Sequence, residues 1–363
     1  MARGDLPFAL GLVGGPGGPL WQGAAGDVRP DTVFQLFSMT KAVGAVAAAI
    51  LVERGQLSLD APVGDTLPAF DALPVLDGWD GDTPRLRAQR SRATLRHLLT
   101  HRSGAAYDSR NVEMQRYRRL AGLPSPRTGK LAALTMPLAF DPGEGWAYGM
   151  GLDWTGLLIQ AVDGRRIDAF CRDEIFAPLG MTETGFALTP ALAPRLAAVF
   201  VRDDAGFAPS DAPTLIDPEF HGLGHGLIGT APDYLRFLTM LIRGGELGGR
   251  RILAEATVAE LTRNQIAPRR LGVLHSFQPE ASADVDFRLG ADLGWSLLGL
   301  RSDAPVPGRR AAGAQGWGGI LNTLYWLDPA RRRAGMLMTQ LRPFTDPRVT
   351  ATLDAFERAT HDL

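Results

Sequence analysis

Segments with the pattern of β-strands stand at both ends of this chain, and segments with the pattern of helices fill its middle. Near the N-terminus, residues 8–15 and 19–26 predict two strands joined by a Gly/Pro turn. Near the C-terminus, residues 293–300, 322–329 and 332–341 predict adjacent strands. This order of elements predicts one α/β domain that is split in the sequence by a helical insertion.

Helical patterns and irregular segments alternate between those strands. The polar residues 71–92 and the arginine-rich residues 105–135 predict loops without regular structure. Apolar periodicity, in most cases ended by glycine, predicts helices over residues 38–54, 94–104, 152–164, 166–181, 231–247 and 347–363.

The charge balance narrows the class of partner. Lys and Arg number 38 and Asp and Glu 39, so the net charge of −1 gives no electrostatic reason to expect nucleic acid or an anionic membrane. No apolar stretch reaches the roughly 18 residues of a membrane span, and the N-terminal segment lacks a signal-peptide pattern. Cys171 is the single cysteine, which excludes internal disulfides and cysteine-based zinc sites. We therefore expect a cytoplasmic protein.

A serine and a lysine stand three residues apart where the first long helix begins. Ser38 and Lys41 open "SMTKAVGAVAAAILVERG", and Lys41 is one of only two lysines in the chain. Three residues along a helix place both side chains on one face. A helix start favours a developing oxyanion, and a lysine kept neutral by apolar surroundings can take the proton of the serine. The pair predicts an activated nucleophile. The alternative is that an S-x-x-K sequence occurs here by chance.

Six motifs in a familiar order extend this interpretation. They are "FSMTK", "LLTHRSG", "FDPGEGWAYGMGLDWTG", "FAPLGMTETGF", "GTAPDYLRF", and "GWGGILNTLYWLDP" with "MLMTQL". Together they span about residues 8–360 and resemble the serine β-lactamase-like superfamily (class C β-lactamases and penicillin-binding proteins), nearest to family VIII carboxylesterases. The resemblance implies an α+β fold of the β-lactamase/transpeptidase type, with an antiparallel sheet flanked by helices. Residues 1–68 and 222–363 would form the sheet domain, residues 69–221 a mainly helical inserted domain, with the active site between them.

The resemblance also implies roles for the matched residues. Ser38 would be the acylated nucleophile, Lys41 its base partner, and Tyr148 of "WAYGM" the tyrosine of the proton relay. The backbone N–H groups of Ser38 and Ile320 would form the oxyanion hole. The resemblance implies no metal and no cofactor, and a small-molecule ester as the substrate.

Two residues depart from the β-lactamase pattern. Trp317 of "QGWGG" replaces the K-T-G lysine, which removes a cation for a substrate carboxylate, and Met150 replaces the Asn of Y-x-N. Both changes favour neutral, apolar acyl esters, with Trp317 as an aromatic wall and Gly318 and Gly319 permitting close approach of the backbone. The helix that usually precedes the first strand of the family is expected to be short or truncated here.

Two pairs of histidines are weaker candidates for functional residues. His221 and His225 in "HGLGH" have the spacing of a metal pair on a helix, but the glycines between them favour a loop. We expect His225 to border the active site, with a structural role as the alternative. His97 and His101 of "RHLLTHRSG" share the spacing, in a segment that the family uses structurally.

These observations predict a serine hydrolase that cleaves small carboxylic esters through an acyl-enzyme on Ser38. The same Ser–Lys–Tyr residues would serve a β-lactamase, a D-amino peptidase or amide hydrolase, or an acyltransferase. A non-enzymatic binder on the same fold is a third interpretation, and the joint presence of Ser38, Lys41 and Tyr148 argues against it. The sequence gives no indication of the oligomeric state.

Overall fold

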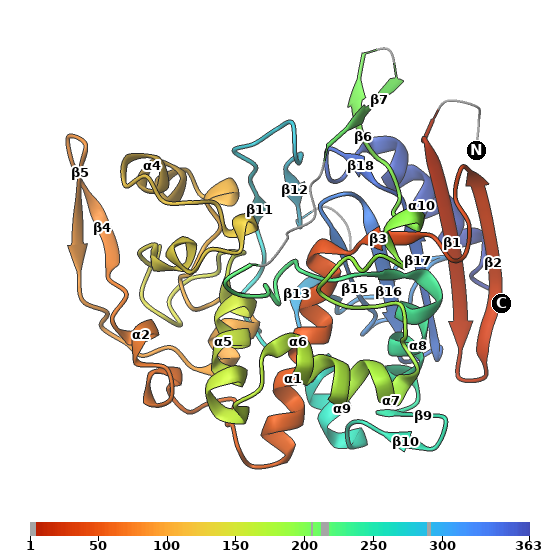
Figure 1. The fold of residues 1–363 in the computed structure, drawn as a ribbon, viewed down its shortest axis with the longest axis horizontal. Helices are drawn as coiled ribbons and strands as arrows, with labels where there is room; N and C mark the ends of the chain where they lie inside the picture. Colours follow the sequence, from red (N-terminus) through yellow and green to blue (C-terminus); the bar gives the residue numbers. More distant parts are fainter. Residues whose placement is uncertain (1–4, 205, 212–217, 289–291) are drawn as a thin grey trace.

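A seven-stranded antiparallel sheet joins the two ends of the chain (Figure 1). The computed structural model describes residues 5–204, 206–211, 218–288 and 292–363. Along the sheet the strand order is β13-β14-β15-β16-β17-β1-β2. These strands are β1 (Phe8–Gly15), β2 (Gly18–Gly26), β13 (Leu293–Trp295), β14 (Leu300–Ser302), β15 (Gln315–Gly319), β16 (Thr323–Asp328) and β17 (Arg333–Met338).

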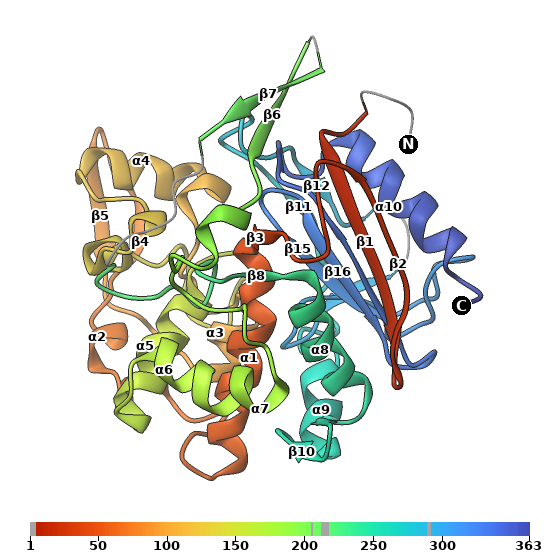
Figure 2. The same cartoon turned by 45° about the vertical axis from the view of Figure 1, so that its right-hand side comes forward.

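Helices cover both faces of this sheet because β1 is apolar on both. Leu10 points into the main core, while its neighbour Ala9 belongs to a smaller cluster with Val349. On the core face, α8 (Ala231–Ile242) packs against β1 and β17. On the other face lies α10 (Pro347–Ala359), as Figure 2 shows. Mixed helices and antiparallel sheet confirm the predicted α+β fold class.

One helix buried on nearly every side lies between the sheet and the helical part of the molecule. It is α1 (Thr40–Glu53), whose residues from Thr40 to Leu51 are all buried, in agreement with the apolar pattern. Its small side chains allow α5 (Gly151–Asp163) and α9 (Glu255–Thr262) to pack against it. Residues at the start of α1 are therefore held by packing on several sides.

Shorter elements complete the structure. The remaining helices are α2 (Pro68–Asp71), α3 (Leu95–Leu99), α4 (Val112–Leu120), α6 (Ile167–Cys171) and α7 (Ala177–Leu179), the last two joined by the π-helical residues Arg172–Phe176. The small sheets pair β3 (Val33–Gln35) with β8 (Ile228–Thr230), β4 (Val75–Asp80) with β5 (Thr83–Arg87), β9 (Glu246–Leu247) with β10 (Arg250–Arg251), β11 (Val273–Leu274) with β12 (Val285–Asp286), and β6 (Val199–Asp203) with both β7 (Gly206–Ser210) and β18 (Leu341–Arg342).

Three expectations about local structure were wrong. Residues 71–92 contain the β4–β5 hairpin, and residues 105–135 contain α4. The hairpin and α4 each have a single fully buried residue, Val75 and Met114, so their sequences lack a clear apolar period. Residues 293–300 form one strand and a tight turn rather than a single long strand. Ser296 Oγ accepts the N–H groups of Leu298 and Gly299 at 3.1 Å each and closes that turn before β14.

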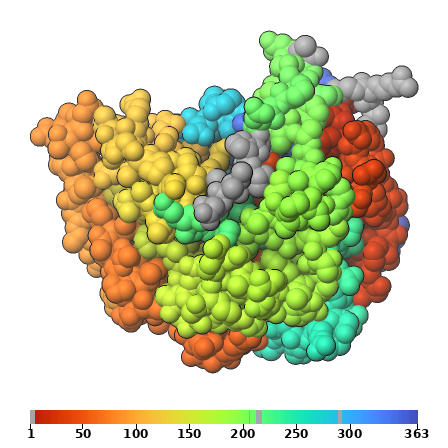
Figure 3. All heavy atoms as spheres, viewed as in Figure 1, coloured from red at the N-terminus to blue at the C-terminus, as the bar shows by residue number. Residues whose placement is uncertain are grey.

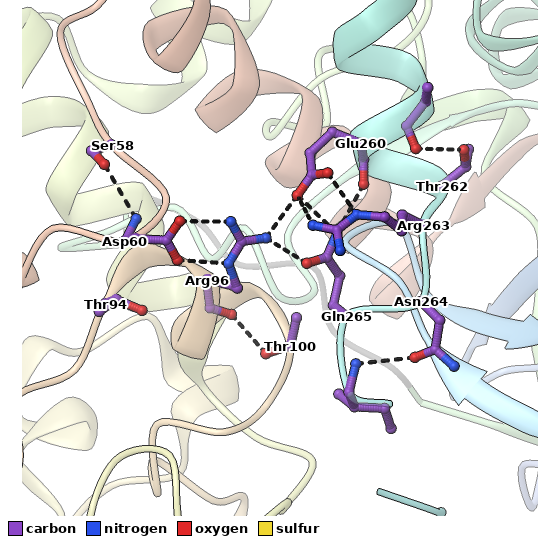
Figure 4. A network of polar contacts seen from close by, with 12 residues as sticks. Ser58, Asp60, Thr94, Arg96, Thr100, Glu260, Thr262, Arg263, Asn264 and Gln265 are labelled. Atoms are coloured by element: carbon purple, nitrogen blue, oxygen red, sulfur yellow. Dashed lines mark hydrogen bonds and ion pairs between the residues drawn. The ribbon is translucent and has the colours of Figure 1, made fainter. Parts of the chain in front are cut away.

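An ionic network ties the helical part to α9 (Figure 4). Arg96 of α3 binds both carboxylate oxygens of Asp60, after α1, at 2.7 Å each. The same guanidinium donates to Glu260 of α9 at 2.7 Å, and Arg263 pairs with Glu260 at 2.8 Å. These contacts fix α3 and the segment after α1 against α9.

The helical segments and the first two strands also occupy different parts of the outer surface. In the space-filling view, segments from β4 to α7 (orange to yellow-green) form much of the visible face, and β1 and β2 (red) lie at its right-hand edge (Figure 3). No helix within the described ranges is long and apolar enough to cross a membrane. The predicted boundaries of the two domains stay a prediction.

Candidate active site

The turn that carries Ser38 is held from both sides. β3 pairs with β8, and the N–H of Leu36 continues that pairing to Leu227 O at 2.9 Å. A 3-10 turn (Phe37–Met39) then leads into α1, and Phe37 has the positive φ of 44° that bulky residues rarely adopt. Ser38 is the second residue of this turn, so its N–H belongs to the amides that a helix start leaves without an internal partner.

Lys41 reaches back to Ser38, as the spacing predicts. The lysine is only 4% exposed, in the first turn of α1. Its Nζ donates to Ser38 Oγ at 3.1 Å, to Gly224 O at 2.7 Å and to Tyr107 Oη at 3.3 Å. Nζ is therefore surrounded by three oxygen atoms, one of which belongs to the hydroxyl of Ser38. Ser38 and Lys41 are thus in direct hydrogen-bond contact at the base of a cavity.

Tyr148 contributes to the same site but makes a different contact. Its ring lies under Lys41, with Nζ 4.7 Å from the ring centroid. Its hydroxyl accepts a hydrogen bond from Trp317 Nε1 at 2.8 Å. His101 holds the residues on both sides of this tyrosine: its carbonyl accepts the N–H of Ala147 at 2.9 Å, and its Nδ1 accepts the N–H of Gly149 at 3.3 Å. Trp317 therefore orients Tyr148, a relation between two predicted residues that the sequence did not indicate.

Tyr107 is a site residue that the sequence analysis missed. Its hydroxyl accepts from Lys41 and donates to Asp153 Oδ2 at 3.4 Å. Burial, and then the charge of Asp153, raise the pKa of Tyr107 well above its usual value, so it stays protonated. Asp153 is fully buried and also accepts the N–H of Gly224 at 2.8 Å. Tyr107 lies in a segment expected to be irregular, and no spacing in the sequence distinguishes it from the other tyrosines.

The glycine pair of β15 places Ile320 beside the Ser38 turn. A Cβ on Gly319 would collide with the carbonyl oxygen of Leu36, so only glycine permits this contact. Ile320 and Gly318 line the same cavity as Ser38. The two N–H groups proposed for an oxyanion hole thus come from neighbouring segments of backbone.

Two adjacent cavities meet at this site. The first has about 680 Å³ of empty space and is lined by Ser38, Tyr107, Tyr148 and Trp317 among others. The second, of about 1270 Å³, shares with it Phe37, Arg127, His225 and Ile320. The cavity beside Ser38 therefore continues into a second one through this shared wall.

His225 and Met150, both predicted to bind substrate, lie in different surroundings. His225 lines both cavities, and its Nε2 is buried without a hydrogen-bond partner among the described residues. Burial lowers the pKa of His225, so the imidazole is neutral near pH 7. Met150 instead lies in the hydrophobic core at 1% exposure and lines neither cavity. Within the described ranges, no cluster of three or more metal-ligating side chains includes His221 or His225.

Several known proteins resemble this chain in sequence or in fold. The Beta-lactamase family model matches residues 1–359. Monacolin J acid methylbutanoyltransferase of Aspergillus terreus is 30% identical over 353 residues, which cover 92% of this chain and 83% of that protein. Lovastatin esterase of Penicillium rubens is 30% identical over 334 residues, covering 86% and 81%. A solved mutant of simvastatin synthase from Aspergillus terreus superposes with a TM-score of 0.87 at 26% identity, covering 99% of this chain and 91% of that one.

Proposed function

The chain belongs to the Beta-lactamase family, and on that premise we propose that it hydrolyses small carboxylic esters through an acyl-enzyme on Ser38. The observation that carries the proposal is the 3.1 Å contact between Lys41 Nζ and Ser38 Oγ in a substrate-sized cavity. Relatives named as an acyltransferase and an esterase support acyl chemistry on this scaffold. The closer assignment to family VIII carboxylesterases stays a prediction.

Acylation would use the contacts of Lys41. This step requires Lys41 as a neutral amine, so that the Ser38 hydroxyl donates to Nζ; the amine then takes that proton as Oγ forms a bond to the ester carbonyl carbon. The N–H groups of Ser38 and Ile320 stabilise the negative charge that develops on the carbonyl oxygen. The bond from the carbonyl carbon to the alcohol oxygen then breaks, and Tyr148 gives its hydroxyl proton to the leaving alcohol.

Deacylation would restore each group. The Tyr148 phenolate takes a proton from water, whose oxygen attacks the acyl carbon, and the lysine ammonium lying over the ring stabilises the phenolate meanwhile. The acid leaves as Ser38 Oγ recovers its proton from Lys41. The hydrogen bond from Trp317 holds the tyrosine oxygen in place through both steps.

The direct test compares p-nitrophenyl esters of increasing acyl length on the wild type and on Ser38→Ala. We expect at least about a thousandfold loss of kcat/KM in Ser38→Ala. Ser109→Ala is the matched control, since Ser109 lines the same cavity and is expected to change the rate by less than about twofold. Full activity in Ser38→Ala would refute the proposal.

Acyl transfer to an alcohol is a second candidate, favoured by the name of the methylbutanoyltransferase relative. Both reactions share the acyl-enzyme and differ in whether water or an alcohol attacks it. Release of p-nitrophenol at rising alcohol concentration, with the products separated by chromatography, distinguishes them. Ester product in excess of free acid would assign the enzyme to the transferases.

Two other hypotheses about the function, a β-lactamase and a non-enzymatic binder, have tests of their own. Nitrocefin turnover that matches ester turnover would favour a β-lactamase despite the tryptophan at position 317. If the wild type failed to react with a fluorophosphonate probe, the chain would be a binder on this fold instead of a serine enzyme.

A further inference from the structure

The wall that joins the two cavities carries an unpaired cation. Arg127 lies in the 3-10 turn Pro126–Thr128 and lines both cavities. Within the ranges that the structure describes, its guanidinium has neither a hydrogen-bond nor an ion-pair partner, and only its backbone N–H is bonded, to Ser125 Oγ. A guanidinium group carries five donors and stays charged at any ordinary pH, so this side chain is ready to bind an anion.

A second arginine lines the larger cavity in a similar state. Arg342 of β18 donates to two neutral oxygens, Ser210 Oγ and the carbonyl of Asp211, the latter at 3.4 Å. Its Nε is buried without a partner among the described residues. Arg342 therefore also keeps donor capacity beside the cavity, and no described carboxylate forms an ion pair with it.

Both arginines line the larger cavity, and their like charges act on each other there. Partial loss of hydration lowers the pKa of Arg127, the charge of Asp108 raises it, and the charge of Arg342 lowers it further. Asp108 is already committed to Arg118, whose Nε lies 2.6 Å from its carboxylate. Arg127 is exposed to solvent, which screens this repulsion, so a bound substrate that excludes water would strengthen the attraction of both arginines for an anion. Glu280 adds a weaker favourable charge and Asp211 also lines the larger cavity, but among the described residues neither carboxylate forms an ion pair with Arg127 or Arg342.

We propose that Arg127 and Arg342 bind a carboxylate of the substrate, at the far end from the ester that reacts on Ser38. Arginine pairs with a carboxylate through two parallel hydrogen bonds, which suits a group fixed at one end of a long substrate. Trp317 stands where the family carries a lysine for such a group, so the cation has moved from the sheet to the wall near Pro126. This inference rests on the proposed acyl chemistry at Ser38 and adds the substrate class.

The carboxylate belongs either to the acyl part or to the alcohol part of the ester, and matched substrates separate the two. For the acyl part, p-nitrophenyl hemiglutarate is compared with p-nitrophenyl valerate, which has the same chain length without the charge. For the alcohol part, the butyrate ester of ω-hydroxyhexanoate is compared with hexyl butyrate. The measured quantity is the ratio of kcat/KM for the charged ester to kcat/KM for the neutral one.

We expect one of these ratios to fall tenfold to a hundredfold, about the strength of a charged hydrogen-bonded pair, in Arg127→Gln and in Arg342→Gln. Arg119→Gln is the control, because Arg119 is an exposed arginine of α4 outside both cavities, and it leaves the ratios unchanged. Thermal unfolding of each variant identifies any loss of folded protein. Equal loss for charged and neutral esters, or no change of either ratio, would overturn the carboxylate site.

A failure of the acyl chemistry gives a different result. If the wild type turns over none of the four esters, the proposed function is wrong, and glutarate binding is measured by tryptophan fluorescence instead. Binding that weakens tenfold or more in Arg127→Gln, and not in Arg119→Gln, would retain the carboxylate site. Absence of glutarate binding to the wild type would refute it.

Discussion

The hydrogen bond from Trp317 Nε1 to Tyr148 Oη allows the proposed proton transfer to be tested quantitatively. Trp317→Phe keeps an aromatic ring in the cavity and removes this 2.8 Å contact. A neutral hydrogen bond is worth about 0.5–1.5 kcal/mol, which corresponds to roughly a 2- to 13-fold loss of kcat. Tyr148→Phe removes the proton donor itself, for which a loss of about a hundredfold to ten-thousandfold is expected.

The double variant Trp317→Phe/Tyr148→Phe decides the mechanism of the effect. If Trp317 acts by orienting the tyrosine oxygen, its replacement has no further effect once that oxygen is gone, so the two losses are not additive. The assay is kcat for a short p-nitrophenyl ester at saturating concentration for all four proteins. The same fold loss from Trp317→Phe in both backgrounds would show that the tryptophan only shapes the cavity, and would refute this reasoning.

A matched control removes the effect of lost volume. Trp146 belongs to the same aromatic cluster, and its buried Nε1 has no hydrogen-bond partner among the described residues. Trp146→Phe therefore loses the same atoms without losing a hydrogen bond. Both substitutions are expected to lower the free energy of unfolding by about 1–2 kcal/mol through incomplete repacking, and only Trp317→Phe is expected to lower kcat through Tyr148.

Three further predictions concern proton transfer and stability. Tyr107→Phe removes the hydroxyl that links Lys41 to Asp153 and is expected to lower kcat by about tenfold to a hundredfold with little change of KM; an unchanged kcat would show that Tyr107 does not position Lys41. Glu357→Gln leaves two arginines without their buried carboxylate, so we expect a loss of about 3 kcal/mol in urea unfolding, and a loss below about 1 kcal/mol would contradict this. The hydrogen bond from Arg263 lowers the pKa of Glu260 from 4.5 to about 2, so its stabilisation is complete above pH 4.5 and disappears as the pH falls toward 2. After allowance for solvent screening this amounts to about 1–2 kcal/mol, and a Glu260→Gln variant should show a correspondingly weaker dependence of stability on acid pH.

Local spacing in the sequence predicted the contact between Ser38 and Lys41, while the catalytic roles of the two residues stay a prediction. Ser38 and Lys41 lie one helical turn apart, and a fixed spacing on one helix translates directly into a contact. The strands at both chain ends were predictable because β1 and β17 are apolar runs bounded by turn residues. In both cases the signal lies within a dozen residues of sequence.

Contacts between distant segments were not predictable in the same way. Tyr107 meets Lys41 across 66 residues, and Trp317 meets Tyr148 across 169 residues. No single sequence carries a pattern for such pairs. The β4–β5 hairpin was missed for a different reason: most of its residues face solvent, so selection for an apolar face is absent there.

The pairing of β1 with β17 has a consequence for biosynthesis. β2 can pair with β1 at once, but Leu10 also lies opposite Met338, so the other edge of β1 waits for more than three hundred further residues before its partner exists. Until then β1 and the apolar α1 are exposed together in the nascent chain, which favours aggregation and slow folding. Since β15 and Ile320 are also made late, the wall of the cavity beside Ser38 is completed only when translation is nearly finished.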